Sequence, residues 1–351
     1  MPPSKTVPRT PSRRALRCLA LAPAAVLAAT GCTAIGDDPD GGGGGGDGTV
    51  TLSFANSYTD QHPHTRCGIQ AVADTMAEAD NGVTVETFPN SQLGGDTARF
   101  NSVMAGDVDM DVQGSSALAA TYAPIGVLDM AYAFEGPDQL FEFFDSSAAD
   151  ELKNGFAEET GTRILDVWFF GMRHFSANEP IREPGDLAGL RMRYPDSPIY
   201  LENAKAVGAE ATAVAFEEVY LALQQGIIDG QENPVPTIAE QSFDEVQSHV
   251  SLSGHQTGSQ LIVINEDKWN ALSGEQQESL QQAVRDTRAE NRSCLEDEER
   301  QILDEWRDSG EVTVVEDVDR EAFAQRAESH FRDTLSGEQL DLYERVRESA
   351  E

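Results

Sequence analysis

The chain has 351 residues, with 25 Lys and Arg against 61 Asp and Glu, and a formal net charge of −36. This acidity excludes a general nucleic-acid binder, which needs a basic surface, and it equally excludes a basic face that lies on anionic lipid. The hydrophobic share of 39% is that of a globular protein, and its length is sufficient for two domains or lobes.

The first 31 residues are typical of an export signal. Five basic residues and no acidic residue occur there, with an apolar stretch from about Cys18 to Ala29 that is too short to span a bilayer. Ala29-Thr30-Gly31-Cys32 resembles a bacterial lipobox, so we expect Cys32 to be lipidated after cleavage. An ordinary signal peptide with an incidental cysteine is the alternative. The pair Arg13-Arg14 leaves open whether export is general or twin-arginine.

Residues 32–49 are expected to be a linker, because six consecutive glycines follow a cluster of aspartates. The run contains GxGxxG, but no strand precedes it and no helix follows it, which argues against a dinucleotide site. We therefore expect a domain that starts near Val50 and touches the outer face of the cell membrane through its lipid anchor only.

From Val50 onward, strand patterns alternate with helix patterns. Residues 51–54 and 83–88 read as strands, and 65–79 carries its apolar residues on one helical face. The other expected elements are strands at 110–113 and 191–194, helices that start at 96 and 198, a helix over 216–225, and mostly helix beyond 268. This order predicts an α/β fold with mainly parallel sheets.

Motifs of catalysis are missing from the sequence: it contains no GxSxG, HExxH, Walker or protein-kinase pattern. His62 and His64 could ligate a metal, but a helix-entry segment is the interpretation we favour, so no metal and no cofactor are expected. Cys67 and Cys294 are the other cysteines beyond the linker, and in an exported protein two such cysteines usually pair. The pair would stabilise the fold by about 3–5 kcal/mol, whereas two separate buried thiols are the alternative.

Basic residues are scarce, so their positions are informative. Arg99 is the only one from Cys67 to Glu151, whereas seven fall between Lys153 and Lys205. Arginine suits a carboxylate because its planar fork donates two parallel hydrogen bonds. Arg191 and Arg193 share one face of a predicted strand that Pro195 ends, and strand ends hold ligands in open α/β folds. A surface salt bridge is the alternative.

Several motifs follow one another in a fixed order: FPNSQLGGD at 88–96, LAGLRMRYP at 187–195, VGA at 207–209, AFEEVYLALQ at 215–224 and DGQENP at 229–234. This order resembles the substrate-binding proteins of tripartite ATP-independent periplasmic (TRAP) transporters, of the DctP type. The resemblance covers about residues 50–290. It implies a type II-like periplasmic binding protein with a hinge and crossing segments, whose two lobes close on a small organic acid.

The lobes implied by the resemblance are residues 50–170 plus 259–297 and residues 171–258 plus 298–351. It implies that Arg193 pairs with the ligand carboxylate. The other implied ligand-binding residues are Arg173, Asn233, Phe216 and Asn56, with Gln113 added as the end of its strand. Trp168 is expected in the core.

Gly114 and Ala117 stand where the sialic-acid-binding branch carries charged residues, so sialic acid is not expected. A monocarboxylate, a sugar acid and a C4-dicarboxylate remain open. The resemblance further implies a monomer that delivers its ligand to membrane permease subunits driven by a sodium gradient. An extracytoplasmic enzyme acting on acidic sugars and a ligand sensor for a signalling kinase are the alternatives.

Overall fold

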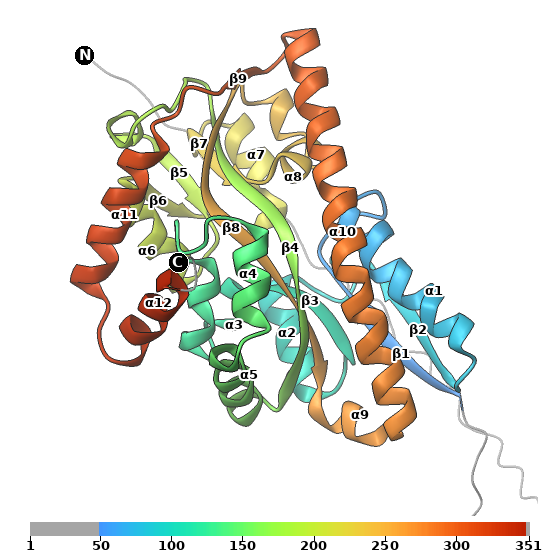
Figure 1. Cartoon of the computed structure of the whole chain (residues 1–351). Helices are drawn as coiled ribbons and strands as arrows, with labels where there is room; N and C mark the ends of the chain where they lie inside the picture. The colour runs from blue at the N-terminus through green and yellow to red at the C-terminus, as the bar shows by residue number, and fades with distance from the viewer. Residues whose placement is uncertain (1–48, 349–351) are drawn as a thin grey trace, which may run out of the picture. The chain divides into compact units, whose positions relative to one another are not determined.

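Strands between Val50 and Val315 form one mixed sheet (Figure 1). The computed structural model describes residues 49–348, so the expected signal segment, Cys32 and the linker before Thr49 lie outside the described residues. The strands are β1 (Val50–Ala55), β2 (Val83–Phe88), β3 (Met110–Gly114), β4 (Thr162–Ala177), β5 (Arg191–Tyr194), β6 (Glu210–Ala213), β7 (Gly230–Asn233), β8 (His249–Asn265) and β9 (Thr313–Val315).

The order of the strands is β2-β1-β3-β8-β4-β7-β5-β6, with β9 beside β8. The short strands pair in parallel on both flanks, as β1 with β2 and β3, and as β5 with β6 and β7. The two long central strands, β4 and β8, are antiparallel to each other and to β7 and β3 respectively. The prediction of mainly parallel pairing therefore holds for the short flanking strands and is wrong for the centre of the sheet.

Helices cover both faces of this sheet (Figure 1). The helices are α1 (Gln70–Ala79), α2 (Asp96–Ala105), α3 (Ser115–Leu118), α4 (Pro137–Phe144), α5 (Ser147–Thr160), α6 (Pro198–Val207), α7 (Val219–Gln224), α8 (Val235–Glu240), α9 (Glu266–Ala271), α10 (Gly274–Ser309), α11 (Arg320–Thr334) and α12 (Glu338–Glu348). A π-helix, η1 (His64–Ile69), precedes α1, and 3₁₀ helices occur at η2 (Ala123–Asp129), η3 (Pro184–Leu187), η4 (Phe216–Glu218) and η5 (Phe243–Glu245). The helix expected over 216–225 is thus the turn η4 followed by the short α7.

The longest helix, α10, has strong signals at both ends. Ser273 Oγ accepts a hydrogen bond from the backbone N–H of Gln276, and Gln276 Oε1 accepts one from the N–H of Ser273, which is a capping box. Gly310 ends the helix in the left-handed conformation, at φ 69°, which glycine adopts without strain. None of the helices in residues 49–348 is long and apolar enough to span a bilayer.

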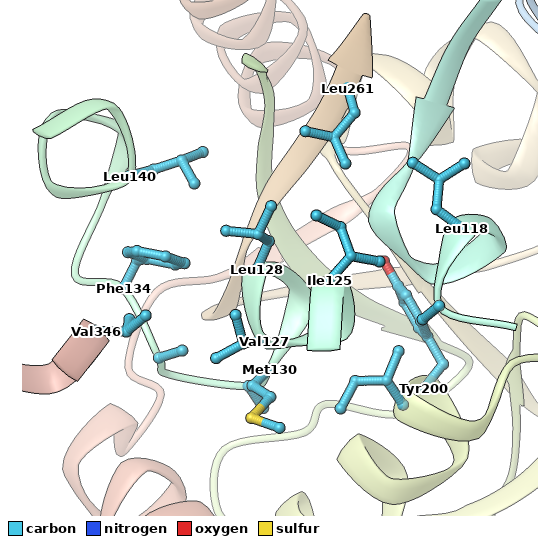
Figure 2. Packing of buried hydrophobic residues seen from close by; sticks show 14 of the residues in the cluster. Leu118, Ile125, Val127, Leu128, Met130, Phe134, Leu140, Tyr200, Leu261 and Val346 are labelled. Atoms are coloured by element: carbon cyan, nitrogen blue, oxygen red, sulfur yellow. The ribbon is translucent and has the colours of Figure 1, made fainter. Parts of the chain in front are cut away.

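Buried apolar residues form three clusters around the sheet. The largest includes Leu118, Ile125 and Leu261 (Figure 2), and each fully buried side chain of this size contributes about 1.5–3 kcal/mol. The second cluster joins β1 and β3 to α1 and α10, and it contains Trp168, whose indole N–H donates to the carbonyl of Val284 at 3.1 Å. Trp168 is fully buried, as predicted.

Candidate functional site

A cavity of about 440 Å³ lies where strands of both flanks of the sheet end. Arg193 is the third of four residues in β5, Asn233 is the last residue of β7, and Gln113 is the penultimate residue of β3. Carboxyl ends of parallel strands are where open α/β folds hold ligands. Five of the six predicted ligand-binding residues line the cavity: Arg193, Arg173, Asn233, Phe216 and Gln113.

Close backbone packing fixes the strands on the β5 side. Gly230 begins β7 between β4 and β5, and a Cβ atom there would lie 2.5 Å from the carbonyl oxygen of Ser176 and 2.7 Å from the sulfur of Met192. No side chain fits at this position without a shift of the backbone. The Asp-Gly of the DGQENP motif therefore serves strand packing, whereas Asn233 of the same motif faces the cavity.

Arg193 is a buried cation without an acidic partner. Its side chain is 3% exposed, and its Nε donates to the carbonyl of Val214 at 2.9 Å. The two terminal nitrogens have no hydrogen-bond partner among residues 49–348, and no carboxylate there forms an ion pair with them. Burial lowers the pKa of Arg193 to about 10, with Arg173 acting in the same direction and Glu232 against it. An uncompensated buried charge is unfavourable, so an anion that entered the cavity would be stabilised here.

Arg173 lines the same side of the cavity but has an internal counter-ion. Its Nε and Nη2 donate to the two carboxylate oxygens of Glu232 at 2.5 and 2.8 Å, and Nη2 also donates to the main-chain oxygen of Glu232 at 2.8 Å. Burial alone would lower the pKa of Arg173, but the adjacent Glu232 outweighs it and the pKa is raised. Only Nη1 lacks a partner within the described chain. Arg173 therefore has one free nitrogen to donate to a ligand, whereas Arg193 has two.

Amide and aromatic groups complete this side. Asn233 Nδ2 donates to Gln231 Oε1 at 2.6 Å, which orients the amide and leaves its oxygen and one N–H for a ligand. Phe216 makes an edge contact with Tyr58, with ring centroids 6.5 Å apart. Tyr58 also packs against Phe170 at 5.5 Å, and all three rings line the cavity. They form an apolar wall of the cavity.

The β3 side of the cavity is polar. Gln113 Nε2 donates to the main-chain oxygen of Asp96 at 2.9 Å and to Asp111 Oδ2 at 2.7 Å. Arg99, buried behind this wall, donates from Nε to Asp111 at 2.7 Å and from Nη2 to Asp96 at 3.1 Å. Its Nη1 donates to the hydroxyl of Ser57 at 2.8 Å, so every nitrogen of Arg99 has an acceptor.

Asn56 does not line the cavity, and its prediction as a ligand-binding residue is the one that the geometry does not support. The residue directly follows β1 and is fully buried. Its Oδ1 accepts hydrogen bonds from the backbone N–H of Tyr58 at 2.7 Å and from the hydroxyl of Thr65 at 3.3 Å. A short amide that bonds to a backbone N–H two residues on shapes a local turn. Asn56 therefore positions Tyr58, which lines the cavity, without lining the cavity itself.

His62 and His64 belong to an aromatic stack behind Tyr58. The ring of His62 lies 4.3 Å from that of Tyr58 and 5.3 Å from that of His64, and both histidines are buried. Burial lowers the pKa of His64 to about 3 and holds the pKa of His62 well below its usual range. No group of three or more His, Cys, Asp or Glu side chains in the described residues is arranged to hold a metal ion.

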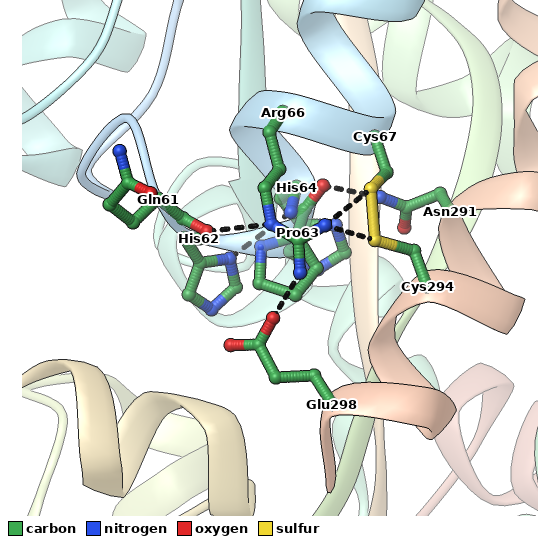
Figure 3. The surroundings of a disulfide bond; sticks show 9 residues. All are labelled: Gln61, His62, Pro63, His64, Arg66, Cys67, Asn291, Cys294 and Glu298. Atoms are coloured by element: carbon green, nitrogen blue, oxygen red, sulfur yellow. Dashed lines mark hydrogen bonds and ion pairs between the residues drawn. A yellow bond between two sulfur atoms is a disulfide. The ribbon is translucent and has the colours of Figure 1, made fainter. Parts of the chain in front are cut away.

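Cys67 and Cys294 form a disulfide that ties η1 to α10 (Figure 3). Arg66 lies against it, donating to the two sulfur atoms at 3.0 and 2.9 Å and pairing with Glu298. Asn291 Nδ2 donates to the main-chain oxygen of Pro63 at 3.1 Å in the same contact. The segment that carries His62, His64 and Tyr58 is thereby fastened to α10.

Other lining residues were not predicted. The polar ones with a direct role in the geometry are Ser57, Tyr58, Asp96, Tyr200 and Gln260. Ser57 and Tyr58 follow the end of β1. Their position after a parallel strand could have predicted that they line the cavity. Residue 96 was predicted only as the start of a helix, whereas Asp96 also lines the cavity. Tyr200 and Gln260 lie within α6 and β8, where no sequence pattern separates a cavity residue from a core residue.

Known proteins share this architecture. The family model described as "Bacterial extracellular solute-binding protein, family 7" (DctP) matches residues 54–337. The chain is 31% identical over 288 residues to the 2,3-diketo-L-gulonate-binding periplasmic protein YiaO of Escherichia coli, covering 81% of this chain and 86% of that protein. It is 30% identical over 267 residues to the C4-dicarboxylate-binding periplasmic protein DctP of Rhodobacter capsulatus, covering 74% and 78%.

A solved structure agrees with these relatives. The TRAP periplasmic solute-binding protein of Roseobacter denitrificans with bound L-galactonate superimposes with a TM-score of 0.78 at 28% identity, over 85% of this chain and 99% of that one. The fold and the function class predicted from the sequence motifs are confirmed. The chain belongs to the DctP family of bacterial extracellular solute-binding proteins, and it is the solute-binding subunit of a TRAP transporter, not an enzyme.

Proposed function

We propose that this solute-binding subunit captures a small organic acid whose carboxylate binds to Arg193. The observation that carries the proposal is a buried guanidinium with two terminal nitrogens that no described residue accepts from. A carboxylate would accept two parallel hydrogen bonds from such a fork. Relatives named for 2,3-diketo-L-gulonate and for C4-dicarboxylates, and the structure with L-galactonate, all concern organic acids, which supports the same ligand class.

Asn233, Phe216 and Arg173 act with Arg193 in this proposal. Asn233 offers its amide to the ligand, Phe216 covers it, and Nη1 of Arg173 adds a second donor beside the carboxylate. Gln113 faces the ligand from the β3 side of the cavity.

Capture would occur by closure of two lobes, residues 50–170 plus 259–297 and residues 171–258 plus 298–351. A ligand that contacts both lobes favours the closed form over the open one, which is sufficient to shift the equilibrium. The permease subunits then receive the ligand from the closed form, with the protein acting as a monomer.

The decisive test is the affinity of Arg193→Ala for an acid found by a thermal-shift screen of mono-, di- and sugar acids at high salt, since binding to the native state raises the midpoint. The substitution leaves a buried carboxylate unpaired, which by analogy with broken buried ion pairs costs roughly 3–5 kcal/mol, or about 150- to 4,000-fold in Kd. Arg182→Ala is the control, because Arg182 is an exposed arginine paired with Asp317. Equal affinities of Arg193→Ala and the parent protein would contradict the proposal.

We further propose that the mature chain begins at a lipidated Cys32 and is held on the outer face of the cell membrane. Support comes from the sequence Ala29-Thr30-Gly31-Cys32 and from the glycine-rich linker that follows it. One lipid chain binds membranes only marginally, whereas several chains on one cysteine anchor stably. Cys32→Ser should move the protein from the membrane fraction to the soluble fraction in cells, while unchanged fractionation would refute the anchor.

A further inference from the structure

The cavity has two chemically different sides, and the difference bears on which organic acid fits. We propose that the β3 side is a wall of hydrogen-bond acceptors, built from Gln113 and Asp96, that selects a hydroxylated monocarboxylate and rejects a dicarboxylate. This inference rests on the proposed function, because it takes the carboxylate to lie on Arg193. Gln113 and Asp96 are thereby specificity-determining residues.

Gln113 presents an oxygen to the cavity. Its side chain is 1% exposed and lines the cavity. An amide nitrogen has two hydrogens, and both are engaged, one by the main-chain oxygen of Asp96 at 2.9 Å and one by Asp111 Oδ2 at 2.7 Å. Both partners are acceptors, which fixes the amide in this orientation, since a flipped amide would bring oxygen against oxygen. What remains for a ligand is Oε1, which takes a hydrogen from a hydroxyl and repels a carboxylate.

Asp96 adds a second acceptor that carries charge. Its Oδ1 accepts from Arg99 Nη2 at 3.1 Å and from the hydroxyl of Ser57. Its Oδ2 has no partner within residues 49–348, and the side chain is 48% exposed at the cavity. Arg99 is 1% exposed, does not line the cavity and has acceptors on every nitrogen, so it cannot turn to a ligand. A second ligand carboxylate at this wall would meet a like charge and no donor cation.

The charges around the cavity lead to the same conclusion. Among the described residues, the lining cations are Arg173 and Arg193, and Glu232 already neutralises Arg173. The lining acids are Asp96, Asp196 and Glu217. One guanidinium is therefore left uncompensated, which matches one carboxylate. Hydroxyl groups along the rest of the ligand both donate and accept, so they can satisfy Gln113 and Asp96 without adding charge.

Matched acids separate the two properties, charge and hydroxylation. At four carbons the set is erythronate, butyrate, tartrate and succinate, and at six carbons it is gluconate, hexanoate, glucarate and adipate. Titration calorimetry of the parent protein at high salt should give tightest binding for erythronate or gluconate. We expect each dicarboxylate and each unhydroxylated acid of the same length to bind at least about tenfold more weakly, as expected for an unpaired polar group or an unfavourable charge.

Two variants assign the selectivity to this wall. Asp96→Asn keeps an acceptor oxygen and removes the charge, so it should improve binding of tartrate relative to erythronate, or of glucarate relative to gluconate, by about tenfold. Gln113→Met removes the acceptor, so it should weaken the hydroxylated monocarboxylate by about tenfold and leave butyrate or hexanoate unchanged. Each readout is a ratio of two acids on one variant, so a general loss of stability cancels.

Some results would overturn the inference and spare the proposed function. One such result is a dicarboxylate that binds the parent protein as tightly as the hydroxylated monocarboxylate does and no longer binds to Arg193→Ala. Another is a ratio of tartrate to erythronate affinity, or of glucarate to gluconate affinity, that is the same in Asp96→Asn as in the parent protein. Failure of every hydroxylated monocarboxylate to bind also overturns it. If an acid that binds the parent protein binds Arg193→Ala equally well, that result instead contradicts the proposed function.

Discussion

Arg99 and Arg193 are both buried arginines near one cavity, and they have opposite surroundings. Arg99, on the β3 side, is 1% exposed and is held by two carboxylates, a hydroxyl and a main-chain carbonyl. Arg193, on the β5 side, is 3% exposed and donates to one main-chain carbonyl. The first is a structural ion pair, whereas the second is a charge kept without a protein partner.

The difference shows that burial of a cation is not sufficient to identify a ligand site. Both arginines stand out in a chain with few basic residues, although Arg99 lies in α2 whereas Arg193 lies near the end of β5. What distinguishes them is the number of acceptors that the fold supplies. A buried cation that the protein has already neutralised stabilises the fold, while one that it has not neutralised is unfavourable until an anion arrives.

The largest expected effect comes from exchanging each arginine for methionine and measuring the stability of the ligand-free protein. Arg99→Met leaves Asp111 buried without its cation, so the free energy of unfolding should fall by about 3–5 kcal/mol. Arg193→Met removes a charge that has no partner, so the free energy of unfolding should stay within about 1 kcal/mol of the parent value or rise. Chemical denaturation without added acid measures both. Equal destabilisation by the two variants would contradict this difference between Arg99 and Arg193.

An intermediate effect concerns His64, another fully buried ionisable side chain. Unlike arginine, histidine can lose its charge, and burial lowers the pKa of His64 from 6.5 to about 3. Below pH 6.5 the unfolded chain therefore takes up a proton that the folded chain does not, and stability is lost as the pH falls towards 3.

His64→Phe removes this loss. Between about pH 6 and pH 4, the free energy of unfolding of the variant should depend less steeply on pH than that of the parent, by about 1.4 kcal/mol for each pH unit. At pH 8 the histidine is neutral in both states, so a comparison at that pH isolates the effect of packing alone. Parallel pH profiles for parent and variant would show that His64 titrates in the folded protein.

The smallest effect is expected for Arg191, two residues before Arg193 in β5. Its side chain is 49% exposed and donates from Nε and Nη2 to the carboxylate of Asp229 at 2.8 and 2.6 Å. Exposed ion pairs contribute little to stability, so Arg191→Ala should leave both the free energy of unfolding and acid binding nearly unchanged. A loss of affinity similar to that of Arg193→Ala would show that the whole strand, and not one residue, decides binding.

The sequence predicted those parts of the site that depend on position along a strand. Alternation along 191–194 and the proline at 195 put Arg193 at a strand end, and the family resemblance supplied Asn233, Phe216 and Arg173. Pairings between distant segments were not predictable in the same way. Nothing local in the sequence says that Glu232 neutralises Arg173, or that Asp111 and Asp96 neutralise Arg99, because these contacts depend on how strands and helices pack.

For the fold, too, local patterns were predictable and distant pairings were not. Short strands such as β2 show the alternation of a half-covered strand and were found. The antiparallel pairing of β4 with β8 was missed, because both long strands are buried almost throughout and show no period-two pattern. Asn56 was predicted to face the ligand but lies outside the cavity lining. A polar residue after a strand can point to a ligand or back to the local backbone, and the sequence does not distinguish the two.

The pairing of β3 with β8 has a consequence for how the chain acquires its structure. Met110 lies opposite Ile264, so the flank that contains β1, β2 and β3 gains its neighbouring strand only after more than 150 further residues have emerged. Contacts so distant in sequence are slow to form because a long loop must close first. The flank formed by residues 50–114 therefore remains incomplete, and exposed to misassociation, until the chain as far as β8 is available for pairing.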